Sequence, residues 1–577
     1  MGRFIRYGRE YGRFFIFAPI LTMADTLAEV VLPMLMSIIV SKGIMNEDIP
    51  FILQMGGVMV LVALFAMGTA IAGAWCSARA STGLGANLRQ GLFDKVQEFS
   101  FANIDTFSTG SLVTRLTNDI TQVQNVTMMG LRMALRAPVM LIGAVVMAVS
   151  LDKELAMVFL ISIPVLGIAL ALIMKNAFPR FDRLQSMFDR LNNNVEENAT
   201  NVRVVKSFVR EDYEKEKFEQ SNSLLYKAAW RAIRLVVMDM PVMTLVMNIT
   251  TIAVVWLGGN KILAGQLEVA NLMAFITYTF QILMSLMMMS MVFIMGSRAV
   301  ISARRILEVF SEPVDLKSSE QSAAHNYQVQ TGRVEFKNVS FRYSKNGEDV
   351  LKNVSFQIEP GQVVAIIGAT GSAKTSLVQL IPRLYDVTGG EVLVDGRNVK
   401  EYTVEHLRDA VGMVLQKNVL FTGTVKENLK WGDENASDEA VAAAARAAQA
   451  HDFIMGMKDG YDTDLSQGGV NVSGGQKQRL CIARALLKKP KILILDDSTS
   501  AVDTATEAKI RETFSTTLKD ATKIIIAQRI TSVMEADKII IIDGGQIVGM
   551  GTHRELLEHN KEYQEIYDSQ KDREVSA

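Results

Sequence analysis

Gly368-Ala-Thr-Gly-Ser-Ala-Lys-Thr375 directly follows the apolar run Val363–Ile367 and opens a helical pattern. The apolar run has the length and composition of a buried strand. Backbone amides in a glycine-rich turn between a strand and a helix can surround phosphate groups, helped by the positive end of the helix dipole. In such a loop Lys374 reaches the terminal phosphates and the Thr375 hydroxyl coordinates magnesium. This stretch predicts a nucleotide site in an α/β fold.

Two further motifs follow this loop along the chain. In Val472-Ser-Gly-Gly-Gln-Lys-Gln-Arg479, a serine and two glycines precede a helical pattern, which is a geometry that can bind an anion. Ile492-Leu-Ile-Leu-Asp-Asp497 has the pattern of a buried strand that ends in a carboxylate suited to magnesium. Alternating β-rich and helical runs predict a largely parallel sheet wrapped by helices. The predicted strands are Val334–Phe336, Val363–Ile367, Glu391–Val394, Ile492–Leu495, Lys523–Ala527 and Lys538–Ile542.

The first half of the chain has the pattern of a membrane domain. Six stretches have the roughly 20 apolar residues that a membrane-crossing helix needs. They cover residues 16–40, 52–76, 128–151, 155–175, 236–258 and 268–296. The two long connections, 77–127 and 176–235, carry many lysines and arginines, so we expect both loops and both termini in the cytoplasm.

The predicted fold is therefore a membrane α-helical domain of six helices with long cytoplasmic extensions, followed by a cytoplasmic α/β nucleotide-binding domain. We expect the membrane domain over residues 1–310, a linker over 311–330 and the nucleotide-binding domain over 331–577. The arginine-rich start precedes a long apolar segment, which predicts a retained membrane segment instead of a cleaved signal peptide.

Composition excludes other classes of function. A formal net charge of −1 offers no concentrated basic surface, so nucleic acid is not an expected partner. The two cysteines, Cys76 and Cys481, lie too far apart in sequence to indicate a disulfide scaffold or a metal knuckle, and we expect both to be reduced.

The three motifs in this order resemble the ATP-binding cassette (ABC) family. Together with six membrane helices and two long cytoplasmic loops, they make the whole chain resemble a bacterial ABC exporter half-transporter. The resemblance implies ATP and Mg²⁺ as cofactors and a dimer in which each ATP lies between one chain's phosphate loop and the other chain's signature motif. It also implies a bacterial plasma-membrane location.

The resemblance assigns further roles. Tyr343 would stack on adenine, Gln416 would touch magnesium and report to the membrane domain, and Asp496 would organise magnesium. Asp503, in Ser500-Ala-Val-Asp503, would lie in the loop that crosses to the partner. The implied nucleotide contacts are Tyr343, Gly368, Thr370, Gly371, Ser372, Ala373, Lys374, Thr375, Ser376, Gln416, Asp496 and Asp503, with Thr375, Gln416 and Asp496 as magnesium ligands.

Three positions depart from the family pattern around one site. Asp497 stands where active members carry a glutamate that polarises the attacking water, and its carboxylate is one methylene shorter. Gln528 replaces the switch histidine, and Ala373 replaces the glycine before the lysine. The signature Ser473-Gly474-Gly475-Gln476 is intact and would serve the partner's site. This asymmetry resembles the degenerate-site subunit of heterodimeric multidrug exporters; a homodimer with two slow sites is the alternative.

Several residues of the membrane domain are candidates for substrate contact or coupling. Asp25 and Glu29 share a helix face, where they could contact a substrate or pair across helices. Asp239 could contact substrate or cap its helix. The last helix supplies Gln281, Met284 and Met288, and flexible methionines suit a cavity for varied apolar compounds, although the same run could face lipid. Residues 103–107 and 210–213 are the predicted contacts with the nucleotide-binding domains.

These observations predict a subunit of an ATP-driven exporter of amphipathic drugs or lipid-like compounds. Its expected partners are a second ABC half-transporter, an amphipathic small molecule and membrane lipids. The alternatives are an ATP-gated channel or regulatory subunit, a peptide exporter and a lipid exporter. A channel would need a charge-lined pore, for which the membrane stretches offer few residues besides Asp25 and Glu29.

Overall fold

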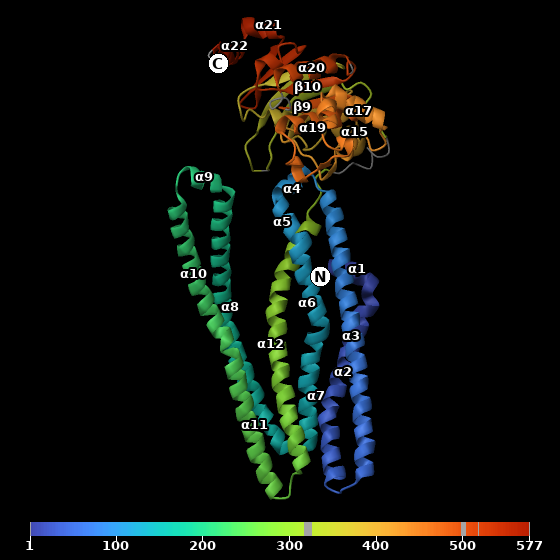
Figure 1. Cartoon of the computed structure of the whole chain (residues 1–577), viewed down its shortest axis with the longest axis vertical. Coiled ribbons are helices and arrows are strands. Elements are labelled where there is room, and N and C mark those ends of the chain that lie inside the picture. The colour runs from blue at the N-terminus through green and yellow to red at the C-terminus, as the bar shows by residue number, and fades with distance from the viewer. Residues whose placement is uncertain (1, 317–325, 345, 498–502, 517, 576–577) are drawn as a thin grey trace. The chain divides into compact units, whose positions relative to one another are not determined.

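The computed structural model describes residues 2–316, 326–344, 346–497, 503–516 and 518–575. The chain divides into two compact units, whose elements are labelled in Figure 1. The first unit comprises Met1–Gln97 and Thr109–Glu312, and the second comprises Glu98–Ser108 and Pro313–Ala577. The short segment 98–108 therefore belongs to the second unit, although the first unit flanks it in sequence.

Six helical spans of the first unit are long and apolar enough to cross a membrane, which confirms the six predicted stretches. In lipid only a helix or a closed barrel satisfies every backbone group internally, so continuous helices are expected here. The helices that contribute the apolar parts are α2 (Gly12–Ile38), α3 (Ile49–Gln97), α7 (Leu135–Leu151), α8 (Lys153–Thr200), α11 (Asp239–Leu263) and α12 (Val269–Ser311).

Several of these helices continue far beyond the thickness of a bilayer. The 49 residues of α3 span about 74 Å at 1.5 Å per residue, more than twice the hydrocarbon thickness. Helix α10 (Glu211–Val237) runs alongside α8, and short α9 (Val202–Ser207) joins them (Figure 1). The remaining α-helices described in this unit are α1 (Gly2–Gly8), α5 (Thr109–Thr114) and α6 (Ile120–Met129). The predicted polar extensions of the membrane helices are thus helical.

Aromatic residues hold the centre of the first unit together. Phe159 of α8 stacks on Phe275 of α12 with ring centroids 6.1 Å apart. Tyr278, also on α12 and fully buried, donates a hydrogen bond from its hydroxyl to the carbonyl of Val30 on α2 at 3.1 Å. These contacts tie α2, α8 and α12, which are far apart in sequence.

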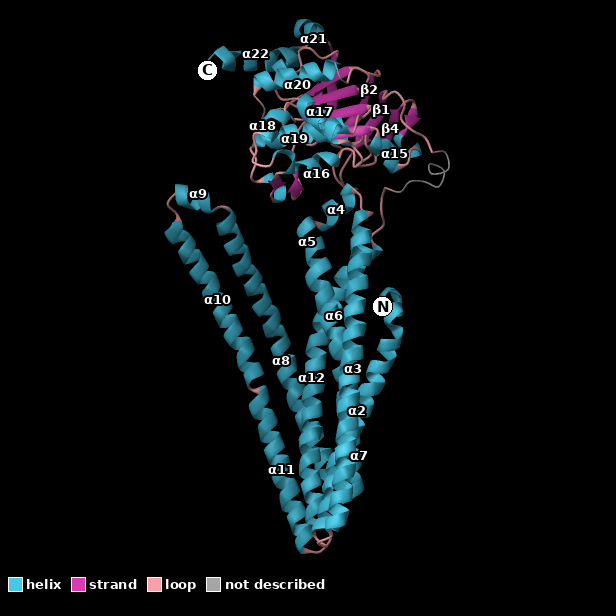
Figure 2. Ribbon diagram, turned by 45° about the vertical axis from the view of Figure 1, so that its right-hand side comes forward, coloured by secondary structure: helices cyan, strands magenta, loops and turns pink. Residues whose placement is uncertain are grey.

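The second unit contains two larger sheets and a small two-stranded one, visible in Figure 2. The six-stranded sheet has the order β12-β11-β3-β10-β9-β6, and all its pairs are parallel except β11–β12. Its strands are β3 (Val363–Ile367), β6 (Val411–Val414), β9 (Ile492–Asp496), β10 (Thr522–Ile526), β11 (Lys538–Asp543) and β12 (Gln546–Gly551). This sheet confirms the predicted parallel α/β arrangement.

The prediction of a single sheet was wrong for two runs. Val334–Phe336 and Glu391–Val394 belong to a separate antiparallel sheet with the order β2-β1-β4-β5. Its strands are β1 (Val334–Phe341), β2 (Leu351–Ile358), β4 (Gly389–Val394) and β5 (Arg397–Asn398). Only residues 342–350 separate β1 from β2, and this favours an antiparallel pair, because parallel strands need a crossover of a dozen or more residues.

Helices and two apolar cores surround these sheets. One core packs β6, β9 and β10 against α16 (Val425–Lys430), α17 (Asp438–Ala447) and α19 (Gly474–Leu487). The other core fills the space between the two larger sheets and α14 (Lys374–Gln379). The remaining α-helices and strands described in the second unit are α4 (Phe101–Phe107), α15 (Val404–Asp409), α18 (His451–Met455), α20 (Thr504–Thr516), α21 (His553–His559), α22 (Lys561–Val575), β7 (Gly423–Thr424) and β8 (Asp464–Leu465).

Candidate functional site

The parallel sheet brings the predicted site residues to one edge. Strands β3, β10 and β9 are neighbours in the sheet, in that order, and run in the same direction. The glycine-rich loop follows β3, Asp496 ends β9, and Gln528 comes two residues after β10. Because the carboxyl ends of parallel strands meet at the same edge, these three segments lie together, and this edge is where open α/β sheets bind ligands.

The loop after β3 needs unusual backbone angles. Gly368 has φ +153°, and a Cβ there would lie 2.1 Å from the carbonyl oxygen of Ile542, so only glycine fits. Of the predicted phosphate contacts, Thr370 and Gly371 are exposed at the loop's surface, whereas Ser372 and Ser376 are buried at its base. The loop is therefore anchored at its base and open where a ligand can approach.

Ala373 occupies a position that favours glycine. It has φ +75° and ψ +18°, in the left-handed region. An L-residue pays roughly 1 kcal/mol for this conformation, a cost that glycine does not carry. The Ala373 methyl packs against the apolar core between the sheets. The departure seen in the sequence is thus a site of backbone strain, directly before the lysine of the loop.

Lys374 bends over the loop that precedes it. Its Nζ donates hydrogen bonds to the carbonyls of Gly368 at 2.9 Å and Ala369 at 2.8 Å. Burial lowers the pKa of Lys374, while the carboxylates of Asp496 and Asp497 oppose that effect. A cation thus lies directly at the loop whose amides are suited to phosphate.

Thr375 and Asp496 form an oxygen-rich pair beside the loop. The Thr375 hydroxyl donates to Asp496 Oδ1 at 3.1 Å, whereas the buried Asp496 Oδ2 has no hydrogen-bond partner among the described residues. Burial, with the neighbouring charge of Asp497, raises the pKa of Asp496. A hydroxyl, an unpaired carboxylate oxygen and the nearby amide of Gln416 match the hard oxygen ligands that Mg²⁺ takes, so these residues fit the metal.

Asp497 and Gln528 are hydrogen-bonded to each other. Gln528 Nε2 donates to Asp497 Oδ2 at 2.8 Å, and the side chain of Gln416 also bonds this carboxylate. Burial raises the pKa of Asp497, and these hydrogen bonds counteract part of the rise. Asp497 itself has φ +47°, in the left-handed region. The structure thus brings together two of the three positions that depart from the family pattern.

The C-terminal helix α22 makes two hydrogen bonds with the segment that contains Gln528. Gln570 Nε2 donates to the carbonyl of Gln528 at 2.8 Å, and Gln570 Oε1 accepts from the backbone amide of Ile530 at 2.8 Å. Sequence reasoning did not single out Gln570, because nothing in a polar C-terminal helix distinguishes one glutamine from its neighbours.

The signature motif forms the start of α19. Ser473 caps the helix, with its hydroxyl accepting from the Gln476 amide at 3.3 Å while Gln476 Oε1 accepts from the Ser473 amide at 2.9 Å. Ser473 and Gly474 are exposed and Gly475 is half-buried, so the first turn is open to a ligand from outside the unit. Asp503 is also exposed, and hydrogen bonds from Thr506 lower its pKa; Ser500 to Val502 lie outside the described residues.

Tyr343 lies in a cluster of aromatic side chains and contacts Ser376, which follows the glycine-rich loop. Its hydroxyl is 2.7 Å from the Ser376 hydroxyl, and its exposed ring meets the Tyr385 ring edge-on at 5.2 Å. The Tyr385 hydroxyl in turn donates to Asp105 Oδ2 of α4 at 2.8 Å. Sequence reasoning placed residues 103–107 at a contact with a nucleotide-binding domain but did not single out Tyr385. The chain of contacts links α4 to the adenine-stacking candidate.

The acidic pair of the first membrane helix has a basic partner on another helix. Arg136 of α7 donates to Asp25 Oδ2 at 2.8 Å and also to Glu29 Oε2. Sequence reasoning weighed substrate contact against pairing across helices, and the structure shows the pairing. It missed Arg136, although an arginine inside an apolar stretch is itself a signal of an intramembrane partner.

The other predicted substrate and coupling residues of the first unit differ in their burial and contacts. Gln281 is buried, and its Oε1 has no hydrogen-bond partner among the described residues. Met284 and Met288 are half-buried on α12. After α9, Phe208 and Val209 are 73% and 81% exposed, and the Arg210 guanidinium lies 6.0 Å from the centre of the Tyr213 ring. The contact of residues 210–213 with a nucleotide-binding domain stays a prediction.

Both units of the chain match models of known protein families. The family model described as the ABC transporter transmembrane region matches residues 15–286, and the model described as ABC transporter matches residues 351–500. An uncharacterised ABC transporter ATP-binding protein of Bacillus subtilis is 39% identical over 559 residues, which are 97% of this chain and 96% of that protein.

Two further comparisons bear on function and fold. A Staphylococcus aureus protein, provisionally named a multidrug export ATP-binding/permease protein, is 33% identical over 485 residues, 84% of this chain and 83% of that protein. A solved bacterial Atm1-family ABC exporter with ATP bound superposes with a TM-score of 0.80 at 24% identity, covering 97% of this chain and 98% of that one. The second comparison supports the fold.

Proposed function

The chain belongs to the ABC transporter family as an exporter half-transporter, and on this premise we propose that its own ATP site is the slow site of a two-subunit drug exporter. The observation that carries the proposal is the hydrogen bond between Gln528 and Asp497. In this hydrogen bond Gln528, at the position of the switch histidine, donates to Asp497, at the position of the catalytic base.

The chemistry of that pair disfavours fast hydrolysis. Asp497 is one methylene shorter than glutamate, and a displacement of about 1 Å costs on the order of a hundredfold in rate. The Gln528 amide cannot carry the positive charge that a histidine can offer to a developing phosphate charge. Its N–H also bonds the carboxylate that would have to polarise water. Both changes weaken hydrolysis without removing the groups that hold ATP.

The groups for holding ATP remain. The amides of the loop and Lys374 would bind the phosphates, and the Tyr343 ring would stack on adenine. Thr375, Asp496 and Gln416 would hold Mg²⁺, which when bound neutralises phosphate charge. Ser473 and the first turn of α19 would complete the partner's site, where the partner's own base would act. In this assignment the chain binds one ATP durably and supports hydrolysis of the other.

The transported compounds are proposed to be amphipathic drugs or lipid-like molecules. Relatives whose provisional names describe multidrug export are 32% and 33% identical to this chain, which supports that class. The lysine- and arginine-rich loops support a plasma-membrane orientation with the second unit in the cytoplasm. A gated channel is less well supported, because Arg136 already pairs with Asp25 and Glu29, the acids that could have lined a pore.

An asparagine substitution at Asp497 tests the proposal. We expect the purified chain alone to hydrolyse ATP slowly, and the complex with a co-expressed partner to show drug-stimulated activity that Asp497→Asn changes by less than about twofold. Ser473→Arg, which blocks the signature offered to the partner, should abolish that activity.

A fast chain would refute the slow-site assignment. If the chain alone hydrolyses ATP briskly as a homodimer and Asp497→Asn removes the activity, Asp497 is a working base. The double variant Asp497→Glu with Gln528→His is the matched gain-of-function control, and it should raise hydrolysis in the chain alone by about tenfold or more.

A further inference from the structure

A pocket of about 320 Å³ lies within the first unit between α8, the junction of α10 and α11, and α12. Its wall is mostly apolar and includes Met174, Phe178 and Phe181 of α8. Two carboxylates, Asp182 of α8 and Asp239 of α11, also line it. Pockets of this size and composition, apolar with a few placed polar groups, are typical small-molecule sites.

A proline and a helix junction border the pocket. Pro179 lies inside the continuous helix α8, between the two aromatic residues of the wall, and has no N–H to donate to the preceding turn. On the opposite side α10 ends at Val237 and α11 begins at Asp239, so the helix is interrupted at the pocket. The Ser290 hydroxyl of α12 also lines the pocket and donates a hydrogen bond to the Met174 sulfur at 3.1 Å.

The carboxylates of the pocket are uncompensated. In the described part of the chain, neither Asp182 nor Asp239 makes an ion pair or a side-chain hydrogen bond, and no lysine or arginine is among the residues that line the pocket. Asp239 is the first residue of α11, but the N-cap position is occupied by Met238, and in the described part of the chain the Asp239 side chain accepts no hydrogen bond. Helix capping therefore does not account for it. Asp182 is exposed and lies in the stretch 176–235 that is expected in the cytoplasm, whereas Asp239 is half-buried and lies in the expected membrane stretch 236–258. A charged group at membrane depth is costly and is retained where it has a partner, which applies to Asp239.

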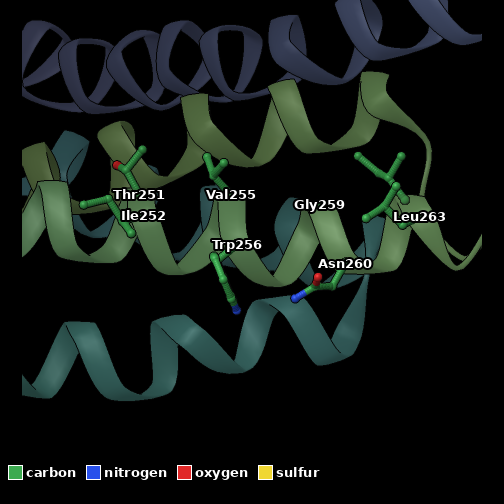
Figure 3. Close-up of a pocket in the computed structure, with 8 residues that line it drawn as sticks. Thr251, Ile252, Val255, Trp256, Gly259, Asn260 and Leu263 are labelled. Atoms are coloured by element: carbon green, nitrogen blue, oxygen red, sulfur yellow. The ribbon is translucent and has the colours of Figure 1, made fainter.

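For comparison with the acidic pocket, a second hollow lies along α11 (Figure 3). It measures about 590 Å³ and is lined by residues of one helix, none of them charged. Thr251 and Val255 point to one side of the helix, and Trp256 and Asn260 to the other. Trp256 and Leu263 are strongly exposed, as expected of side chains that face lipid. This hollow has no group that could select a charged ligand.

We propose that the acidic pocket binds an organic cation with an aromatic body, and that this is the substrate class of the exporter proposed above. The two carboxylates attract the positive centre. The faces of Phe178 and Phe181 bind a cation through their negative quadrupole, and the flexible thioether of Met174 adapts to ligands of different shape. No lysine or arginine lines the pocket to attract an anion of the same shape.

Two ions of one shape and opposite charge test the pocket. Tritiated tetraphenylphosphonium and tetraphenylborate are titrated onto the full chain in lipid nanodiscs, with empty nanodiscs subtracted, in the absence of ATP. Combining Asp182→Asn and Asp239→Asn should weaken phosphonium binding by about tenfold, since each charge contact in a partly exposed site contributes a few-fold. Tetraphenylborate binding should not weaken, and Trp256→Ala in the contrasting hollow should leave both titrations unchanged.

The outcomes separate this inference from the proposed function. Equal loss of both ions in the double variant, or no loss of the phosphonium, overturns the acidic pocket as a cation site. If phosphonium binds as expected but neither it nor any other amphipathic compound is transported by the complex, the pocket stands and the proposal of a drug exporter fails. Asp239→Glu, which keeps the charge, should retain binding within about threefold, and a larger loss also counts against the charge-based mechanism.

Discussion

Replacing Arg136 by methionine should destabilise the first unit more than either single change at its acidic partners. Arg136 faces Asp25 and Glu29 across the α2–α7 interface, with side-chain exposures of 28%, 9% and 37% in that order. Methionine keeps the length and the apolar stem but removes the charge. The variant therefore leaves two carboxylates without a partner, one of them buried.

The expected sizes follow from burial. Removing one partner of a buried pair costs about 3–5 kcal/mol, because the remaining charge is desolvated and uncompensated, and this applies to Asp25. Glu29 is partly exposed, so its share is about 1 kcal/mol or less. Asp25→Asn removes the buried charge itself and leaves Arg136 paired with Glu29, which should cost about 2 kcal/mol. The predicted order of destabilisation is Arg136→Met, then Asp25→Asn, then Glu29→Gln.

Thermal unfolding of the full chain in lipid nanodiscs measures this order. For a unit of this size, Arg136→Met should lower Tm by about 10 °C. The triple variant with methionine, asparagine and glutamine at the three positions is the control, and it should recover most of that loss because no charge remains unpaired. An Arg136→Met protein as stable as the wild type, or a triple variant no better than the single one, would refute the reasoning.

Two predictions concern the second unit. Gln570→Ala should speed hydrogen exchange at the Ile530 amide by about fivefold, the equivalent of about 1 kcal/mol for one lost hydrogen bond. The control Gln564→Ala, on the same helix, should leave this exchange rate unchanged. Equal exchange rates in the two variants would contradict the role of Gln570. Asp395 accepts hydrogen bonds from residues 330–333, and although burial raises its pKa, these bonds outweigh burial and lower it. The stabilisation by the ionised Asp395 is therefore full above about pH 5 and is lost as pH falls through the lowered pKa. The Tm difference between wild type and Asp395→Asn should shrink in acid, and a constant difference from about pH 7 to about pH 3 would contradict this.

The features predicted best from sequence were those with local, repeated signals. Six apolar stretches and the strand that precedes the glycine-rich loop depend on composition and spacing alone, and both appear in the structure as expected. Side-chain partners were harder, because pairing across helices depends on packing that no local pattern records. Asp25 was singled out from sequence, whereas Arg136, more than a hundred residues later, became its partner only in the folded unit.

The second sheet shows a different limit. Strand β1 has the same apolar alternation whether its neighbours are parallel or antiparallel, so pattern alone could not assign it to a sheet. The positive φ of Ala373 was also outside sequence reasoning, which noted the replacement of a glycine at that position but not the backbone strain. Long-range contacts such as Gln570 with the Gln528 segment follow from the path of the C-terminal helix, which no motif encodes.

The membership of residues 98–108 in the second unit has a consequence for exchanging parts between homologous genes. Asn103 is buried and donates to the carbonyl of Pro313, and Asp105 accepts from Tyr385, so this short segment completes the surface of a unit that otherwise begins two hundred residues later. A chimera joined only near residue 313 would separate it from its native partners. Functional hybrids should therefore need two crossovers, with the eleven-residue segment inherited together with the C-terminal half.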